Sequence, residues 1–140
     1  MIDEKWFHEY EEVFSNAKDK SALFDRYYHP EATFIHPIKG AFHGKDEIVG
    51  FWNAGKTSGH AGIHEILHFK NLVIQDDKVA AEILVEWRCF ADTNYLGPHK
   101  KGDVFYGKCA AFYDRKDGKF IRVQVYLNLM DKADDSIPSG

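Results

Sequence analysis

The sequence predicts an α+β domain in which a strongly curved antiparallel sheet is wrapped by N-terminal helices around a pocket of small-molecule size. Apolar residues near the N-terminus recur at helical spacing, and four long segments with strand-type alternation follow. Two short turns, Asp76-Asp77 and Lys116-Asp117-Gly118, join these segments in pairs. Because each alternating segment has one apolar and one polar face, the helices must cover the apolar face of the sheet.

Three helices are expected at the N-terminal side of the chain. Asp3 is a suitable N-cap for the first, and apolar residues such as Tyr10 and Phe14 follow at helical spacing. The His29-Pro30 step ends the second, since the residue before proline avoids the α region. The expected ranges are Asp3–Lys18, Ser21–Tyr28 and Asp46–Ala54.

The rest of the chain is predicted to be strands, turns and one longer loop, Thr93–Lys101. Two short strands, Ala32–His36 and Ala41–His43, precede the third helix. The four long strands are expected at Ile63–Gln75, Lys78–Asp92, Gly102–Arg115 and Lys119–Met130. We expect a single domain over residues 1–131 and a flexible C-terminal tail over residues 132–140.

Composition excludes several classes of function. The 140 residues carry a net charge of −4 without a basic patch, which argues against nucleic-acid binding. No stretch approaches the roughly 20 apolar residues of a membrane span, and the charged N-terminus does not resemble a signal peptide. Cys89 and Cys109 lack metal-binding spacing. We therefore predict a cytoplasmic protein with two reduced, mostly buried thiols.

Three stretches resemble a known family. They are Tyr28–Pro37, Phe42–Trp52 and Asp117–Ile121, which look like an acidic-Ala-Thr-apolar-x-Asp-Pro stretch, a Gly-x-x-x-Ile helix entry and a final hairpin. In these features and in its order of elements, over roughly residues 5–130, the chain resembles the SnoaL-like proteins of the nuclear transport factor 2 superfamily. The resemblance implies a cone-shaped, cystatin-like α+β barrel around a pocket, and a homodimer. It does not define the chemistry, because this fold hosts many functions.

The resemblance suggests three catalytic candidates. His36 stands where ketosteroid isomerase has its general-base aspartate, and Tyr10 lies near that enzyme's oxyanion-hole tyrosine. (That isomerase is a standard worked case of pKa tuning.) His68 is similar to a strand histidine of scytalone dehydratase that acts as an acid/base group. The remaining catalytic residues of those enzymes fall near Ala110 and Cys89, so the resemblance to either enzyme is half complete.

The residues themselves leave alternatives open. His36 ends a strand at the expected cavity mouth, and an imidazole with a pKa near 6.5 suits proton transfer; its other role would be that of a capping histidine. His68 lies within a strand and is useful only if it faces the cavity. Tyr10 is either an oxyanion donor or a packing residue. Trp52, Trp87 and Phe112 are expected to line the cavity as substrate-binding walls.

A metal site is not expected. His60, His64 and His68 would share a helix face, but here they fall in a loop and a strand, where residues four apart are separated by about 13 Å. We predict no cofactor.

The leading hypothesis is a cofactor-independent enzyme that isomerises, dehydrates or cyclises an apolar, oxygenated substrate such as a polyketide, terpenoid or steroid-like compound. The alternative is a non-catalytic module of the same fold that binds a small ligand or dimerises. Two or more polar groups that converge in one dry cavity would favour the enzyme.

Overall fold

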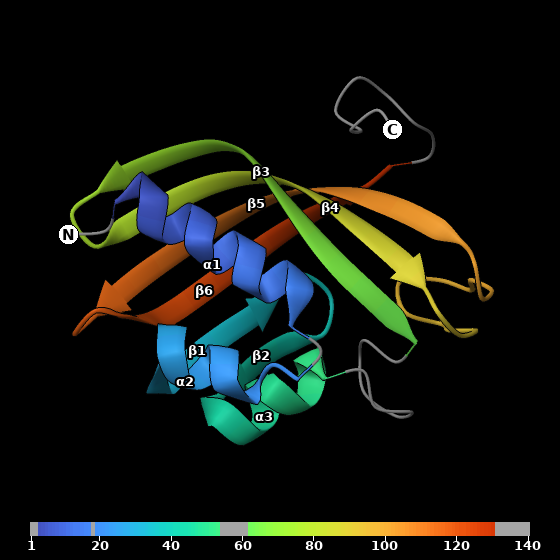
Figure 1. Ribbon diagram of the computed structural model, residues 1–140, viewed down its shortest axis with the longest axis horizontal. Coiled ribbons are helices and arrows are strands. Elements are labelled where there is room, and N and C mark those ends of the chain that lie inside the picture. The colour runs from blue at the N-terminus through green and yellow to red at the C-terminus, as the bar shows by residue number, and fades with distance from the viewer. Residues whose placement is uncertain (1–2, 18, 54–61, 131–140) are drawn as a thin grey trace.

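The computed structural model describes residues 3–17, 19–53 and 62–130 of the chain. Three helices, α1 (Glu4–Asn16), α2 (Ser21–Tyr27) and α3 (Gly44–Trp52), lie against one face of a curved six-stranded sheet (Figure 1). The strands are β1 (Tyr28–His36), β2 (Gly40–His43), β3 (Ile63–Gln75), β4 (Lys78–Cys89), β5 (Val104–Lys116) and β6 (Lys119–Leu129). The prediction of an α+β fold with N-terminal helices and four long strands is confirmed.

The sheet has the order β2-β1-β6-β5-β4-β3. All neighbouring strands are antiparallel except β1 and β6, which run parallel. Register shifts interrupt the β3–β4 ladder between Phe69 and Asn71 and the β5–β6 ladder between Asp114 and Arg115. Such bulges increase the local twist of a strand, and they help the long strands to curve around the helices.

The second helix and the first strand differ from the prediction at their junction. Helix α2 ends at Tyr27, and β1 already begins at Tyr28 rather than at Ala32. The extended conformation favoured before Pro30 lets this segment continue as a strand. Pro30 has no N–H to donate, and the β1–β6 register is indeed interrupted between Tyr28 and Thr33.

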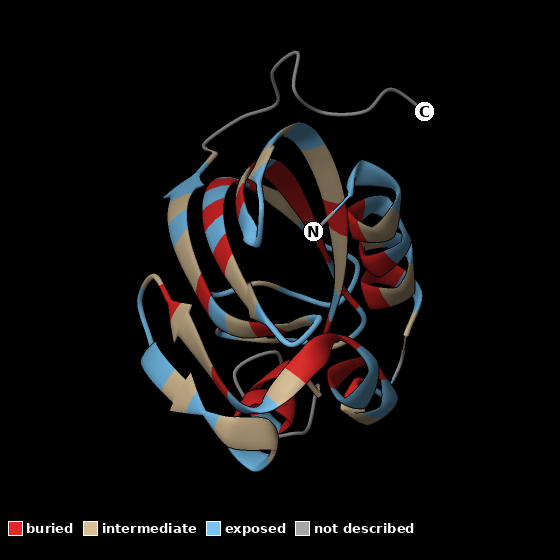
Figure 2. Cartoon of the chain, turned by 90° about the vertical axis from the view of Figure 1, so that its left-hand side faces the viewer, coloured by how far each residue is buried: buried red, intermediate tan, exposed pale blue. Residues whose placement is uncertain are grey.

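Helix α1 is fixed at its start and along one face. Asp3 caps the helix by accepting a hydrogen bond from the backbone N–H of Trp6 at 2.7 Å. Phe7, Tyr10 and Phe14 are buried against the sheet. Figure 2 shows that buried positions occupy the inward side of the helix and alternate along the strands. This alternation confirms the predicted apolar face of the sheet.

Helix α1 also covers the free edge of β3. The backbone N–H of Leu67 donates to the Ser15 hydroxyl at 3.0 Å, and the N–H of Phe69 donates to the Glu11 carboxylate. An uncovered edge strand offers its unpaired N–H groups to other chains. Here helix side chains accept those hydrogen bonds, so α1 both closes the core and protects the edge.

None of the helices in the described part of the chain has the length and apolar character needed to span a bilayer. Cys89 and Cys109 are buried free thiols, as predicted. The predicted tail, residues 132–140, lies outside the described residues, and so does most of the loop that follows α3.

Candidate functional site

A pocket lies between the helices and the concave face of the sheet. Its cavity volume is about 60 Å³, and it is partly open to solvent. Nine of its lining residues are aromatic: Tyr10, Phe14, Tyr28, Phe34, Phe51, Trp52, Trp87, Tyr95 and Tyr113. The polar groups His36, Glu65 and Cys109 interrupt this aromatic and aliphatic wall. A few polar groups within a mostly apolar pocket are typical of small-molecule sites.

His36 lies at the end of β1 and lines this pocket, as the sequence predicts. Its Nδ1 accepts hydrogen bonds from the backbone N–H groups of Ile38 and Lys39, at 3.0 and 2.9 Å. Its Nε2 lies 2.8 Å from the Tyr95 hydroxyl. Because Nδ1 accepts, the ring proton belongs on Nε2, which donates to the Tyr95 oxygen. In this arrangement both nitrogens of a neutral imidazole are engaged within the protein.

Tyr95 reaches the pocket from the loop between β4 and β5. It is 5% exposed, and burial raises the pKa of its hydroxyl above the ordinary value. The loop is held in place by paired backbone hydrogen bonds between Thr93 and His99. The hydroxyl oxygen of Tyr95 accepts from His36, so its own proton is not directed at that imidazole. Tyr95 is thus a neutral hydrogen-bond donor whose position is set by His36.

Glu65 is the acidic residue of the pocket. It lies on β3 directly opposite Trp87 of β4. The residue as a whole is half-buried, but its carboxyl oxygen Oε2 is shielded from solvent. Burial raises the pKa of this carboxyl from 4.5 to about 7, although Lys20, the indole of Trp87 and His64 lower it in part. A carboxyl group with such a pKa can take up or release a proton near neutral pH.

Trp87 forms the wall beside Glu65. It is 3% exposed, its ring stacks on Phe105 with a centroid separation of 4.9 Å, and it meets Tyr95 edge to face at 6.1 Å. Gly107 also lies against the indole, and a Cβ there would stand 2.8 Å from the Trp87 ring. The ring is therefore tightly confined. Its Nε1–H is buried and makes no hydrogen bond of ordinary geometry among the described residues, although it interacts with the Glu65 carboxyl and lowers the pKa of that group.

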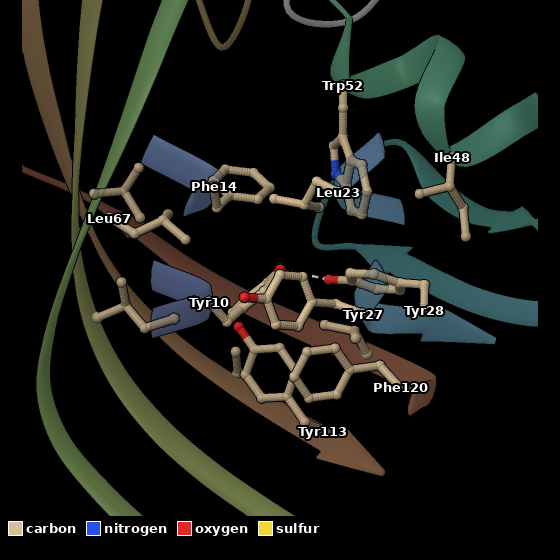
Figure 3. Packing of buried hydrophobic residues seen from close by; sticks show 14 of the residues in the cluster. Tyr10, Phe14, Leu23, Tyr27, Tyr28, Ile48, Trp52, Leu67, Tyr113 and Phe120 are labelled. Carbon is tan, nitrogen blue, oxygen red and sulfur yellow. Dashed lines mark hydrogen bonds between the residues drawn. The ribbon is translucent and has the colours of Figure 1, made fainter. Parts of the chain in front are cut away.

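Tyr10 lines the pocket from α1, but its hydroxyl is paired with that of Tyr28 at 2.5 Å. Figure 3 shows the two rings pointing their hydroxyl groups toward each other, with Tyr113 and Phe120 nearby. Burial is the main reason that the pKa values of Tyr10 and Tyr28 are raised well above the ordinary value. Tyr10 is thus a neutral, internally paired group at the pocket floor. Its suggested role in oxyanion stabilisation remains a prediction.

The structure does not bring His68 or Phe112 into the pocket. His68 pairs with Leu84 on the opposite face of the sheet, where its Nε2 lies 3.2 Å from the carboxylate of Glu86. Phe112 is 50% exposed and contacts Tyr126 on the outer face of β5 and β6. The expectation that Phe112 lines the cavity is wrong, and His68 does not meet the condition of facing it, because alternate residues of a strand point to opposite faces. The other two predicted wall residues, Trp52 and Trp87, do line the pocket.

Sequence reasoning missed Glu65 and Tyr95. The signal for Glu65 was present in the strand alternation, since Glu65 shares its face with the apolar residues Ile63 and Leu67. A carboxyl group on an apolar face points to a buried acid. Tyr95 gave no comparable signal, because it lies in a loop where no periodicity indicates which side chains are buried.

No group of three or more His, Cys, Asp or Glu side chains that could hold a metal ion occurs among residues 3–17, 19–53 and 62–130. Within the described structure, the polar groups that line the pocket include Glu65, His36, Cys109, Tyr95, Trp87 and the paired Tyr10 and Tyr28.

The open curved sheet, the three helices beneath it and the pocket between them define a cone-shaped α+β class of protein. A family model described as a SnoaL-like domain matches residues 7–123, and the chain belongs to this family. The resemblance expected from the sequence is thereby confirmed. No curated protein matches the chain.

Solved structures share the fold at low sequence identity. A candidate polyketide cyclase from Xanthomonas campestris is 19% identical, with a TM-score of 0.71 and 87% of each chain covered. An NTF2-like protein from Anabaena variabilis is 19% identical, with a TM-score of 0.61 over 91% of this chain and 94% of that chain. An epoxide hydrolase from M. tuberculosis is 9% identical, with a TM-score of 0.62 over 86% and 80%. At these identities the likeness concerns the fold alone.

Proposed function

We propose that this protein is a cofactor-independent enzyme that moves a proton on a small, apolar, oxygenated substrate, as an isomerase, dehydratase or cyclase does. The single observation that carries the proposal is Glu65, a carboxyl group with a pKa of about 7 inside an aromatic pocket. A general base works best when its pKa lies near the working pH. The names of structural neighbours, which include a candidate polyketide cyclase, are compatible with this class.

In the proposed reaction Glu65 is the general base. Its ionised carboxylate takes a proton from a carbon next to a carbonyl group, and the electrons of the broken C–H bond move to the carbonyl oxygen. Tyr95 donates a hydrogen bond to the oxygen as negative charge develops there. The protonated Glu65 then returns the proton to the substrate, at the same or another carbon, and the enzyme is restored.

His36 has a different role here from the one the sequence suggested. A histidine whose Nδ1 accepts two backbone hydrogen bonds and whose Nε2 donates to Tyr95 has no nitrogen left to act as a base in that state. We assign it as a positioning residue. It holds the hydroxyl oxygen of Tyr95 in place by donating a hydrogen bond to it. The Tyr95 proton is then directed away from the imidazole, and into the pocket when substrate is bound.

The proposal is tested by measuring the exchange of protons for deuterium at the carbon next to a carbonyl group. Cyclopentanone in D₂O is incubated with the protein, and loss of its α-proton signal is followed by NMR. Wild type should accelerate exchange, and Glu65→Gln should lower that rate by about 100-fold or more, the usual contribution of a general base. Glu82→Gln, an exposed glutamate on the outer face of β4, serves as the matched control and should behave as wild type. Equal rates for wild type and Glu65→Gln would contradict the proposal.

A non-catalytic binding module is the second candidate, and the nine aromatic residues of the pocket wall favour it. It would bind the ketone without accelerating exchange in any variant. The same NMR experiment therefore distinguishes the two functions.

We also propose that the protein is a cytoplasmic homodimer. The two buried free thiols fit a reducing compartment. Phe112 and Tyr126 lie exposed and in contact on the outer face of the sheet, which suits an interface with a second copy. Light scattering should give twice the 16.1 kDa chain mass, and Phe112→Glu should reduce it to that of the monomer.

A further inference from the structure

We propose that the indole N–H of Trp87 is a binding group for an oxygen atom of the ligand, so that the pocket recognises compounds with a carbonyl group. This inference rests on the proposed function and names the substrate class for it. Trp87 was expected from the sequence only as an aromatic wall. The structure gives its nitrogen a more specific task.

The first argument is the cost of an unpaired donor. A buried N–H without a hydrogen bond costs about 1–3 kcal/mol, and most buried polar groups in proteins are paired. The Nε1–H of Trp87 is buried and makes no hydrogen bond of ordinary geometry within the described chain; its interaction with the Glu65 carboxyl leaves it incompletely paired. Such a group is expected where a bound molecule supplies the acceptor.

The second argument is the confinement of the ring. Phe105 stacks on the indole, Gly107 lies against the edge of its six-membered ring, and Tyr95 contacts it edge to face. Each of these contacts resists rotation of the ring toward another acceptor. The N–H of this pocket-lining residue is therefore held in one orientation, which reduces the ordering that binding requires.

The third argument is the neighbourhood of the donor. Glu65 faces Trp87 directly across the β3–β4 ladder on the same side of the sheet. Side chains of opposed residues lie about 5 Å apart at Cβ. A carbonyl oxygen at the indole N–H would therefore place its α-carbon within reach of the Glu65 carboxyl. An enolisable ketone or ester has this pairing of an acceptor with an adjacent acidic C–H, and a hydrocarbon or an isolated hydroxyl group does not.

Tyr95 stands beside Trp87 and is the proposed second donor. Two donors on one oxygen would stabilise the negative charge of an enolate more than that of the starting ketone, because the charge develops only during the reaction. Trp87 would then contribute to both binding and rate.

The test uses binding, which does not depend on catalysis. The chain has three tryptophans, so wild type labelled with ¹⁵N gives three indole N–H signals for Trp6, Trp52 and Trp87. Cyclopentanone is the ligand, and methylenecyclopentane, of the same shape but without oxygen, is the comparison. The ketone should move the Trp87 indole signal downfield, whereas the hydrocarbon should leave it near its starting position. The signal is assigned by its disappearance in Trp87→Phe.

Trp87→Phe also keeps most of the aromatic wall while it removes the N–H. Its affinity for the ketone should fall by about tenfold, the effect of one lost hydrogen bond to a buried donor, and its affinity for the hydrocarbon should change by about twofold or less. Trp6→Phe, outside the pocket lining, is the matched control and should bind both ligands as wild type does.

The inference is overturned if wild type does not bind the ketone, if the Trp87 signal stays unmoved when it binds, or if Trp87→Phe binds the ketone as tightly as wild type. Failure of the proposed function has a different signature. If Glu65→Gln exchanges α-protons as fast as wild type while the Trp87 signal still responds to the ketone, the binding group stands and the general base does not.

Discussion

The imidazole of His36 and the hydroxyl of Tyr95 meet at 2.8 Å although 59 residues separate them in the chain. The first residue ends strand β1, and the second lies in the loop after β4. In this contact the imidazole proton lies on Nε2 of His36 and is donated to the hydroxyl oxygen of Tyr95, the proposed hydrogen-bond donor to the substrate.

Tyr95→Phe should lower the rate of proton exchange by about 100-fold, since the lost hydroxyl is proposed to act on the negative charge that develops on the substrate oxygen. The affinity for the ketone should change little, because the aromatic ring is retained. The measurement is the exchange rate as a function of ketone concentration, which separates kcat from KM. Tyr126→Phe removes an exposed hydroxyl on the outer face and should have no effect. A Tyr95→Phe variant with a normal kcat would exclude the hydroxyl as a donor.

The stability of wild type should fall as the pH rises from about 4.5 to 7. The folded-state pKa of Glu65, about 7, lies above its ordinary value of 4.5, so the unfolded chain releases this proton first. The contribution is full below pH 4.5, is lost progressively up to pH 7 and stays lost above it. At about 1.4 kcal/mol per pKa unit, this amounts to about 3 kcal/mol.

Urea unfolding of wild type and Glu65→Gln between pH 4 and 8 checks this contribution. The glutamine variant lacks the titrating group, so its free energy of unfolding should gain on that of wild type by about 3 kcal/mol over this range. A difference between the two proteins that stays constant with pH would show that Glu65 ionises normally.

His68→Gln should leave proton exchange within about twofold of wild type, since His68 lies on the face of the sheet that points away from the pocket. Burial alone would raise the pKa of Glu86, but hydrogen bonds from Arg88 and His68 hold it below the ordinary value. Loss of the His68 contact should cost about 0.5–1.5 kcal/mol of stability, measured by urea unfolding. A large loss of activity in a folded His68→Gln protein would contradict the placement of the site.

Gly107→Ala should disturb Trp87. The added Cβ would stand 2.6 Å from Cδ1 of Leu127 and 2.8 Å from the Trp87 ring, so a side chain of the pocket wall must move. We expect a loss of about 1–3 kcal/mol in stability and a changed near-UV circular dichroism spectrum. Gly50→Ala in α3 has open space around the new Cβ and should raise stability by up to about 1 kcal/mol. If Gly107→Ala and Gly50→Ala change the stability by the same amount, close packing at Gly107 is not the cause of the change.

The sequence supports the order of elements and the apolar face of the sheet because both depend on local periodicity. Alternation in β4 correctly places Trp87 inside, and the same rule would have placed Glu65 inside and Phe112 outside had it been applied to them. The turn at Lys116-Asp117-Gly118 and the helix N-cap at Asp3 are likewise local signals that the structure bears out.

Only the tertiary structure decides which polar groups share the pocket. The register of β3 against β4 sets Glu65 opposite Trp87, and the path of the loop carries Tyr95 to His36. Both depend on contacts between residues far apart in the chain, which local periodicity does not encode. The raised pKa of Glu65 likewise depends on how fully the surrounding helices and strands bury its carboxyl group, which strand alternation by itself does not determine.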